Sequence, residues 1–385
     1  MCKVEFHDLG VDTVRPNEAG LIMAIRTDAR HATRELKRNL AKHLELHEKP
    51  RARFESAVLD GQIEKVLHGA YKEWGHGVLS ALSENVDYSK YGITNPDEQK
   101  LQVHFYNSQD LGARAIRKAL EMGYRANPLV DPMLISLDDL IHDNVIPIYE
   151  IAFSRLFSVD GKQQYDYVPR PGHEPLSYQF EKIREEAARR HLETGVKAPI
   201  VFIEDNVRYA KMLNWLTDEM KKYDIFEHAE MAGISTCFCC ATDQERNNIV
   251  FDGKTVPVEA IVDYGSTVVE VSTPRDLMFD GFVVEMGETT MRLPGIFMDV
   301  ESRFKIHPET ADQFCKEISQ HNVTFCETLK DAFGVDVPLS WFAVVADPVA
   351  HITDVSPMTP MAHVMRNVGD RFIPAPPAPK LRVAN

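Results

Sequence analysis

The sequence predicts an α+β protein, and changes in hydrophobic period carry that prediction. Residues 1–25 show no clear period, and from Thr27 to about residue 125 the apolar residues mostly recur every three or four positions, as on helices. After Asn144 they alternate with a period of two, as on strands. Between Pro175 and Tyr223 a helix–strand–helix pattern is the strongest structural signal. We therefore expect a helical N-terminal region, a long β-hairpin, a central helix–strand–helix, and a β-rich C-terminal half with one late helix.

These patterns divide the chain into four consecutive regions. We expect a mainly helical region over 1–145, the hairpin with the helix–strand–helix over 146–230, a mixed β-rich domain over 231–370, and a proline-rich tail over 371–385.

The N-terminal region contains three predicted helices. The first begins near Thr27 and is closed by Pro50, and the second covers 55–82. The third has Ser108 as its N-cap and ends before Gly123.

The predicted hairpin covers 148–168. Its apolar residues alternate on either side of Asp160-Gly161, a pair that suits a type I′ turn because both central residues there need a positive φ. In the central segment Gly195 ends a helix, and an apolar strand over 199–203 precedes a second helix.

The C-terminal half contains further Asp-Gly pairs between apolar runs, at 252–253 and 280–281. The run Val256 to Val271 predicts a strand pair or a strand bent at Gly265, and Trp341 to Ala346 predicts a buried strand. The late helix covers 309–333.

Composition limits the possible functions. The net charge of −15 disfavours general binding to nucleic acid or to an anionic membrane, and no run of about 18 apolar residues predicts a membrane span. The start lacks a secretory signal pattern, and six cysteines are too few for a disulfide framework. We expect a cytoplasmic protein, or a virion component assembled in the cytoplasm, that is not secreted.

The segment Arg26 to Arg53 is basic, with nine Lys or Arg against four Asp or Glu. It could meet an acidic partner, or it could be a solvated helix face.

The chain contains none of the common nucleotide, serine-hydrolase or zincin motifs. Its most unusual cluster is Cys237, Cys239 and Cys240, a candidate metal site because thiolates bind zinc. Cys315 and Cys326 could be distant partners. Buried free cysteines are the alternative.

Carboxylate–histidine pairs three positions apart share a helix face, as the ligands of di-iron bundles do. Two such pairs occur, and their members are Glu73, His76, Asp139 and His142. Glu45 and Glu121 could supply the single carboxylates of such a centre.

The stretches 134–144 (LISLDDLIHDN) and 200–206 (IVFIEDN) resemble the first and last motifs of haloacid-dehalogenase-type phosphatases. In this chain Ser136 stands at the nucleophile position and Leu140 at the threonine position. The resemblance therefore implies a degenerate, phosphatase-like binding or regulatory protein.

Glu204-Asp205 also resembles the acidic pair of response regulators, but no phosphoacceptor aspartate with following Thr and Lys stands at the right distances. The simpler interpretation, which the sequence favours, is that Asp205 or Asn206 caps the next helix.

The order of elements over 145–300 resembles the tailed-phage major capsid fold, in which a hairpin loop precedes a spine helix, a strand–helix axial domain and a strand-rich region. This resemblance implies a self-assembling structural subunit without catalytic activity, whose partners are copies of itself. The alternatives are a metal-dependent enzyme of hydrolase or di-iron oxygenase type, and the regulatory protein described above.

Overall fold

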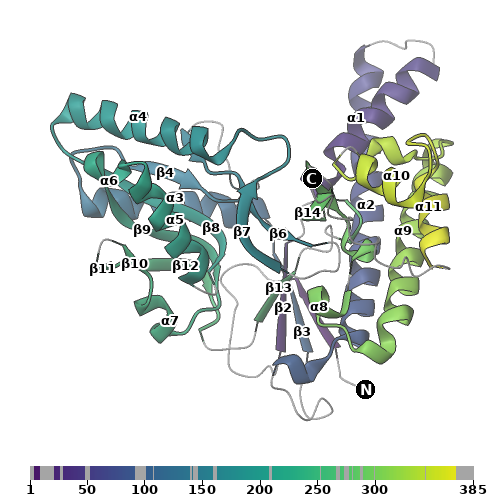
Figure 1. Cartoon of the computed structure of the whole chain (residues 1–385). Coiled ribbons are helices and arrows are strands. Elements are labelled where there is room, and N and C mark those ends of the chain that lie inside the picture. Colours follow the sequence, from purple (N-terminus) through teal and green to yellow (C-terminus); the bar gives the residue numbers. More distant parts are fainter. Residues whose placement is uncertain are drawn as a thin grey trace, which may run out of the picture. The chain divides into compact units, whose positions relative to one another are not determined.

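The computed structural model describes residues 4–8, 21–26, 29–47, 53–91, 101–106, 108–138, 141, 146–158, 163–207, 210–251, 253–265, 269–272, 277–279, 281–286, 289–298, 300–342 and 344–369. The chain forms two compact units, each built from three segments (Figure 1). Unit 1 takes its residues from 1–27, 95–154 and 168–272. Unit 2 takes its residues from 28–94, 155–167 and 273–385.

A five-stranded parallel sheet is the centre of unit 1, with the strand order β12-β9-β8-β4-β5. Its strands are β4 (Met133–Ser136), β5 (Ile148–Glu150), β8 (Ala198–Val207), β9 (Ala229–Cys239) and β12 (Val258–Asp263). β4 and the first seven residues of β8 are buried throughout, as expected for strands of a parallel sheet that is covered on both faces.

Helix α3 (Ser108–Ala126) covers one face of this sheet. Its apolar side chains, including Ala115 and Met122, pack on Val201 and Ile203 of β8. Ser235 of β9 lies on the same face, because its hydroxyl donates to the carbonyl oxygen of Ala115 at 2.8 Å. This contact satisfies a buried polar side chain inside an apolar layer.

The predicted helix–strand–helix is confirmed as α4 (Leu176–Thr194), β8 and α5 (Ala210–Lys222). α4 ends at Gly195, which has φ +71° and is the αL residue that closes many helices. Phe180 of α4 is buried and its ring stacks on Tyr223, just after α5, with centroids 5.2 Å apart. The short helix α6 (Ile225–His228) packs against α4 and leads into β9.

Unit 1 also contains a second parallel sheet, with the order β1-β3-β2-β13. Its strands are β1 (Val4–Asp8), β2 (Leu21–Arg26), β3 (Leu101–Tyr106) and β13 (Val269–Ser272).

Between β9 and β12 lie α7 (Asp243–Asn247) and the antiparallel pair β10 (Val250–Phe251) and β11 (Lys254–Thr255). That pair confirms the hairpin predicted at 252–253, whereas the run 256–271 supplies β12 and β13 to two different sheets.

Unit 2 is mainly helical, and its long helices α2 and α9 lie side by side (Figure 1). Its α-helices are α1 (Ala29–His47), α2 (Arg53–Asn85), α8 (Val300–Phe304), α9 (Ala311–Phe333), α10 (Ala346–Thr353) and α11 (Met361–Gly369). Its 3₁₀ turns are η2 (Tyr88–Tyr91), η4 (Gly295–Phe297), η5 (Pro308–Thr310) and η6 (Leu339–Trp341). Trp74 of α2 donates from its indole Nε1 to Asn322 Oδ1 of α9 at 2.7 Å, and Phe279 packs edge-on against Trp74 and Phe325.

The sheet of unit 2 has the order β15-β14-β6-β7 and uses both strands of the predicted hairpin. Its strands are β6 (Phe153–Phe157), β7 (Gln163–Pro169), β14 (Phe282–Met286) and β15 (Thr289–Leu293). The hairpin is shorter than predicted, because residues 148–150 form β5 of the other unit's parallel sheet. Asp160 and Gly161 lie outside the described residues, and assembly through the hairpin stays a prediction.

The mixed α/β fold class is confirmed, and so are the predicted helices at 27–50, 55–82 and 309–333. The helix predicted from Ser108 is also present, but it continues through Gly123 to Ala126 and does not end before Gly123. The strand predicted at Trp341 to Ala346 is wrong, because these residues end η6 and begin α10. A short buried apolar run does not by itself distinguish a strand from helical turns. Gly281 directly precedes β14, and Asp280 lies outside the described residues. The proline-rich tail lies outside the described residues.

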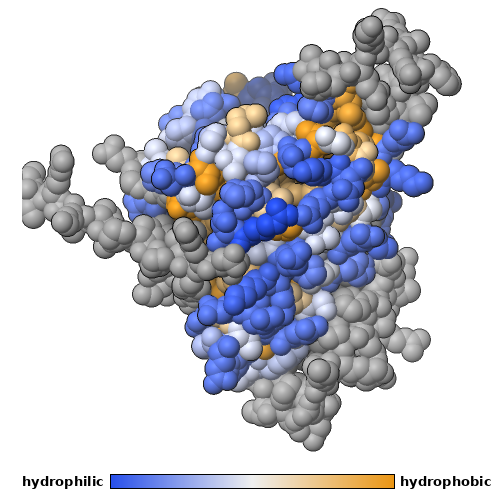
Figure 2. Space-filling model, turned by 90° about the vertical axis from the view of Figure 1, so that its right-hand side faces the viewer, coloured by the Kyte–Doolittle hydropathy of each residue, from blue (hydrophilic) through white to orange (hydrophobic). Residues whose placement is uncertain are grey.

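The face shown in Figure 2 is mostly hydrophilic, with hydrophobic residues in small groups. None of the helices in the described part of the chain is long and apolar enough to cross a membrane.

Candidate acidic site at the carboxyl edge of the parallel sheet

In the five-stranded sheet, the direction in which successive strands are added reverses between β4 and β8. In chain order the strands occupy positions 2-1-3-4-5, so the chain goes from β4 to β5 on one side and later returns to β8 on the other. In open parallel sheets, ligands bind outside the carboxyl ends of the strands at such a switch point. The residues that follow β4 and end β8 are therefore the first place to look for chemistry.

At the end of β4, Ser136 holds the backbone that carries Asp138. The Ser136 hydroxyl donates to the Asp138 carbonyl oxygen at 2.7 Å, and the Asp138 N–H lies 3.3 Å from Ser136 Oγ. The Leu137 N–H donates to the carbonyl oxygen of Ile203 at 2.9 Å, which fixes this turn against β8. Asp138 is only 8% exposed.

At the end of β8, Glu204 is a buried carboxyl group, 8% exposed. Burial raises its pKa well above the usual range, and the carboxyl groups of Asp205 and Asp138 raise it further, whereas Arg170 acts in the opposite direction. Glu204 and Asp205 also share a hydrogen bond, which requires a proton on one of them. We call Asp138, Glu204 and Asp205 the acidic cluster.

Two acceptor oxygens at this strand end are buried and have no hydrogen-bond partner among the described residues: Glu204 Oε2 and Asn206 Oδ1. Residues two apart on a strand lie on the same face, so both oxygens belong to one side of the sheet. An unsatisfied buried acceptor costs about 1–3 kcal/mol. A hydrogen-bond donor or a bound cation would stabilise these two oxygens.

Arg170 places a positive charge beside the acidic cluster. Its guanidinium donates to the carbonyl oxygens of Leu137 (2.7 Å) and Phe153 (3.1 Å), and its Nη1 lies 3.6 Å from Glu150 Oε1. Its side chain is only 11% exposed. Arg170 therefore fixes the ends of β4, β5 and β6 to one another and is the cation that offsets part of the acidic cluster's charge.

Among the described residues, polar side chains at the ends of β9 and β12 already have partners within the chain. Thr236, opposite Glu204 on β9, donates to the carbonyl oxygen of Phe238 at 2.7 Å. Asp263, at the end of β12, forms an ion pair with Arg246 and accepts from the Gly265 N–H at 2.9 Å. At this edge, the buried acceptor oxygens that have no partner among the described residues therefore lie at the end of β8, beside Asp138 after β4.

The sequence favoured Asp205 or Asn206 as a helix cap, and the structure contradicts this. β8 continues to Val207, with Asn206 opposite Phe238 of β9, and α5 begins only at Ala210. These polar residues continue the strand because β9 offers them a parallel partner.

The predicted cysteine cluster lies at the end of β9. Cys237 and Cys239 are buried and Cys240 is half-buried, and burial raises the pKa of the Cys239 thiol. Cys315 and Cys326 lie on α9 of unit 2. Within the described ranges, no three or more His, Cys, Asp or Glu side chains are arranged to hold a metal ion.

The predicted di-iron ligands that the structure describes belong to two different units. Glu73 is exposed and His76 is half-buried on α2 of unit 2, whereas Glu121 is exposed on α3 of unit 1. Asp139 and His142 lie outside the described residues, as does the side chain of Glu45.

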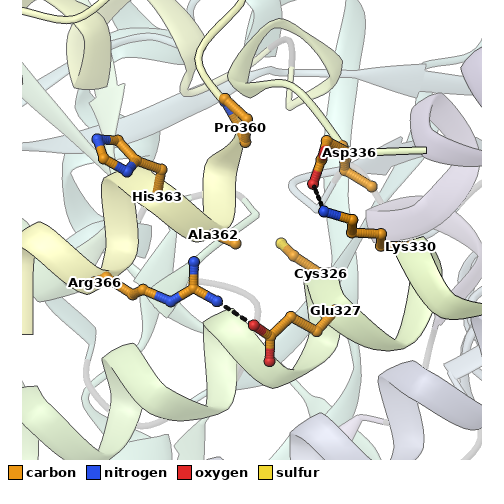
Figure 3. Close-up of a pocket in the computed structure, with 9 residues that line it drawn as sticks. Cys326, Glu327, Lys330, Asp336, Pro360, Ala362, His363 and Arg366 are labelled. Atoms are coloured by element: carbon orange, nitrogen blue, oxygen red, sulfur yellow. Dashed lines mark hydrogen bonds and ion pairs between the residues drawn. The ribbon is translucent and has the colours of Figure 1, made fainter. Parts of the chain in front are cut away.

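Unit 2 contains a cavity of about 140 Å³ between α9 and α11 (Figure 3). Two ion pairs border it, Glu327 with Arg366 and Lys330 with Asp336, and its floor includes Cys326. Burial raises the pKa of the Cys326 thiol well above its ordinary value, so this thiol stays protonated at neutral pH. Both cations already have carboxylate partners, and the cavity offers no activated nucleophile.

Asp138 and Arg170 were not identified as site residues from the sequence. A signal for Asp138 was present, because both β4 and β8 are apolar runs that end in acidic residues, LISLDD and VFIEDN. Arg170 stands in a proline-rich loop, and nothing in its neighbourhood in the sequence indicated a contact with Leu137, 33 residues away.

The fold and the site define a class of architecture: an open parallel α/β sheet whose switch point carries buried carboxyl groups. No protein-family model, curated protein or solved structure matches this chain. Its function is therefore argued from the site itself.

Proposed function

We propose that this chain binds a divalent cation of the Mg²⁺ type at the switch point, and that the cation serves a ligand or substrate bearing a phosphoryl group. The observation that carries the proposal is the pair of buried acceptor oxygens, Glu204 Oε2 and Asn206 Oδ1, beside Asp138. Carboxylate and amide oxygens are the ligand types that Mg²⁺ and Ca²⁺ prefer.

A cation accounts for the burial of the cluster better than a proton alone. Without a cation, burial favours the protonated form of Glu204, and protonation still leaves two acceptor oxygens unsatisfied at the strand end. A divalent cation would replace the proton and bind acceptor oxygens directly. Mg²⁺ usually takes only one or two protein carboxylates and keeps several waters. Asp138 and Glu204 are therefore enough for it, although among the described residues the three carboxyl groups of the acidic cluster are not arranged to hold a metal ion together.

The position of the site supports a phosphoryl ligand. A crevice at a switch point is open to solvent beyond the strand ends, and a cation held there by few protein ligands keeps open positions. Phosphate oxygens commonly fill such positions. A metal-dependent hydrolase would turn such a ligand over, whereas a phosphatase-like regulatory protein would bind it without turnover.

Calorimetric titration of the full chain with Mg²⁺, and with Mn²⁺ as a second probe, tests cation binding. We expect Asp138→Asn and Glu204→Gln to weaken binding at least tenfold. The matched control is Asp131→Asn, because Asp131 precedes β4 at the opposite end of the strand and accepts from the Tyr124 hydroxyl. Equal affinity in the wild type and in Asp138→Asn and Glu204→Gln would contradict the proposal.

Adding inorganic phosphate tests the second part. We expect it to increase Mg²⁺ affinity in the wild type and to have no such effect in Glu204→Gln. Hydrolysis of p-nitrophenyl phosphate that depends on Mg²⁺ and on Glu204 would indicate an enzyme, and cooperative binding without hydrolysis would indicate a binding protein. If phosphate has no effect on Mg²⁺ affinity and no hydrolysis occurs, the phosphoryl part of the proposal is wrong.

A further inference from the structure

The cavity between α9 and α11 of unit 2 combines an apolar interior with a charged mouth (Figure 3). Its interior is lined by Cys326 and Val337, which are buried, and by Pro360 and Ala362, which are half-buried. A solute can therefore reach the mouth from solvent and place an apolar part among buried groups. The residues of the two ion pairs at the mouth have side chains that are about half exposed: Glu327, Lys330, Asp336 and Arg366.

The two cations at the mouth keep hydrogen-bond donors that their ion pairs do not use. Arg366 donates from Nη2 to Glu327 Oε1, and Lys330 Nζ lies 2.8 Å from Asp336 Oδ1. A guanidinium has five N–H donors and an ammonium group has three, so each cation can bind an anion without losing its carboxylate partner. In Figure 3 the guanidinium of Arg366 and the ammonium of Lys330 lie on opposite sides of Cys326.

The wall of the cavity that precedes α11 is fixed by backbone hydrogen bonds. The Leu339 N–H donates to the Thr359 carbonyl oxygen at 2.9 Å. The Met361 N–H donates to the Val337 carbonyl oxygen, also at 2.9 Å. These bonds hold the segment after α9 against the segment that leads into α11. A site that is formed before its ligand arrives loses less conformational freedom on binding, and this favours affinity.

The volume and chemistry of the cavity define the class of ligand. The volume is about 140 Å³, and an apolar cavity of about 150 Å³ holds benzene, which has about six heavy atoms. The apolar interior suits a short hydrocarbon group. The mouth suits a carboxylate, because the planar guanidinium of arginine matches two carboxylate oxygens.

We propose that this cavity binds a small aliphatic carboxylate. Its carboxylate group lies at the mouth between Arg366 and Lys330, and its hydrocarbon group lies inside, on Cys326. Simple carboxylic acids and α-amino acids share this chemistry, and the ammonium group of an amino acid would meet the second oxygens of Glu327 and Asp336. The bound ligand contacts both α9 and α11 and holds the two helices together. The site is separate from the acidic cluster, which belongs to unit 1.

Saturation-transfer NMR of the full chain with isovalerate and with L-valine tests the proposal in the wild type. Two molecules of similar shape are the controls: 3-methyl-1-butanol has no charge, and 3-methylbutylamine has the opposite charge. We expect the carboxylates to bind at least tenfold more tightly than either control. Binding of isovalerate indicates that a carboxylate alone is sufficient, and binding of L-valine alone indicates an amino acid. If neither carboxylate binds, or if the alcohol or the amine binds equally well, the proposal is wrong.

Variants locate the ligand in the cavity. Arg366→Gln and Lys330→Gln should each weaken binding at least tenfold, because each removes a charged donor at the mouth. Ala362→Leu should abolish binding, because the larger side chain fills the interior. Lys316→Gln is the matched control, since Lys316 is an exposed cation of α9 outside the cavity, and it should keep the wild-type affinity.

Hydrogen exchange supplies a second measurement. The ligand should slow exchange in peptides from α11 in the wild type and should have no such effect in Ala362→Leu. If Arg366→Gln, Lys330→Gln and Ala362→Leu all keep the wild-type affinity, the carboxylate binds elsewhere and the proposal is wrong.

Discussion

Replacing Glu204 by Gln is the most informative perturbation of this protein, because its effect on stability has a definite sign. The folded state raises the pKa of Glu204 above the ordinary value of 4.5, so the folded state keeps a proton that the unfolded chain releases. The free energy of unfolding must then fall as the pH rises from the pKa of Glu204 in the unfolded chain toward its higher pKa in the folded protein. One proton corresponds to about 1.4 kcal/mol per pH unit, as long as the folded group stays protonated.

From pH 5 to pH 7 the unfolding free energy of the wild type should therefore fall through this one group. Glu204→Gln has no proton to release and should lack this part of the slope. Glutamine also has nearly the same shape and can donate to Asp205, so the variant should be more stable than the wild type at pH 7 without cations. Saturating Mg²⁺ should reverse that order, because a ligand at a hundred times its Kd stabilises the folded state by about 2.7 kcal/mol.

The assay is hydrogen exchange in increasing urea at pH 5, 6 and 7, followed on peptides from β8 and β9. Those strands pair over their whole length, so their opening reports on the sheet that contains Glu204. Glu230→Gln is the matched control, because Glu230 is exposed near the start of β9, at the opposite edge. Identical pH slopes for the wild type and Glu204→Gln would refute the reasoning, since they would show that Glu204 carries no extra proton in the folded state.

Three further predictions concern packing and reactivity. Gly281→Ala should lower the melting temperature, because Gly281 has φ +84° and a Cβ there would come 2.1 Å from the Leu293 carbonyl oxygen. Gly253→Ala is the control for backbone strain alone, because φ is also positive at Gly253 but no atom lies within 4 Å of a Cβ there. Trp74→Phe should reduce the unfolding free energy by about 1–3 kcal/mol, because it leaves the buried Asn322 amide without its indole donor, and urea denaturation would measure this. Iodoacetamide at pH 8 should modify Cys315 far more slowly in the native protein than in urea, because burial raises its pKa to about 12; equal rates in both states would contradict this.

Much of the secondary structure could be predicted from local sequence. The stripe of apolar residues on α9 and the break at Gly334, which has φ +67°, locate that helix to within two residues at each end. The same reasoning located α4 and Gly195. It failed at Trp341, where a short buried apolar run fits a strand and a helical turn equally well.

The candidate site could be predicted only in part. Acidic residues at the ends of two apolar runs were visible in the sequence. For Asp205 and Asn206, however, the sequence favoured helix capping before the pairing of β8 with β9 was known. Arg170 contacts Leu137, which lies 33 positions away along the chain. In the cavity of unit 2, Arg366 contacts Glu327, which lies 39 positions away. No local pattern encodes such contacts.

The sequence by itself determined the longer helices, the central strand, the acidic balance and the presence of carboxyl groups at the ends of two apolar runs. Only the tertiary structure decided that β4 lies between β5 and β8 and that both strand ends meet at one edge, with Arg170 beside them. The physical reason is that period and capping are set by neighbours within a few residues. The order and register of parallel strands are set instead by packing between segments far apart in the chain, such as β4 on β8 under α3.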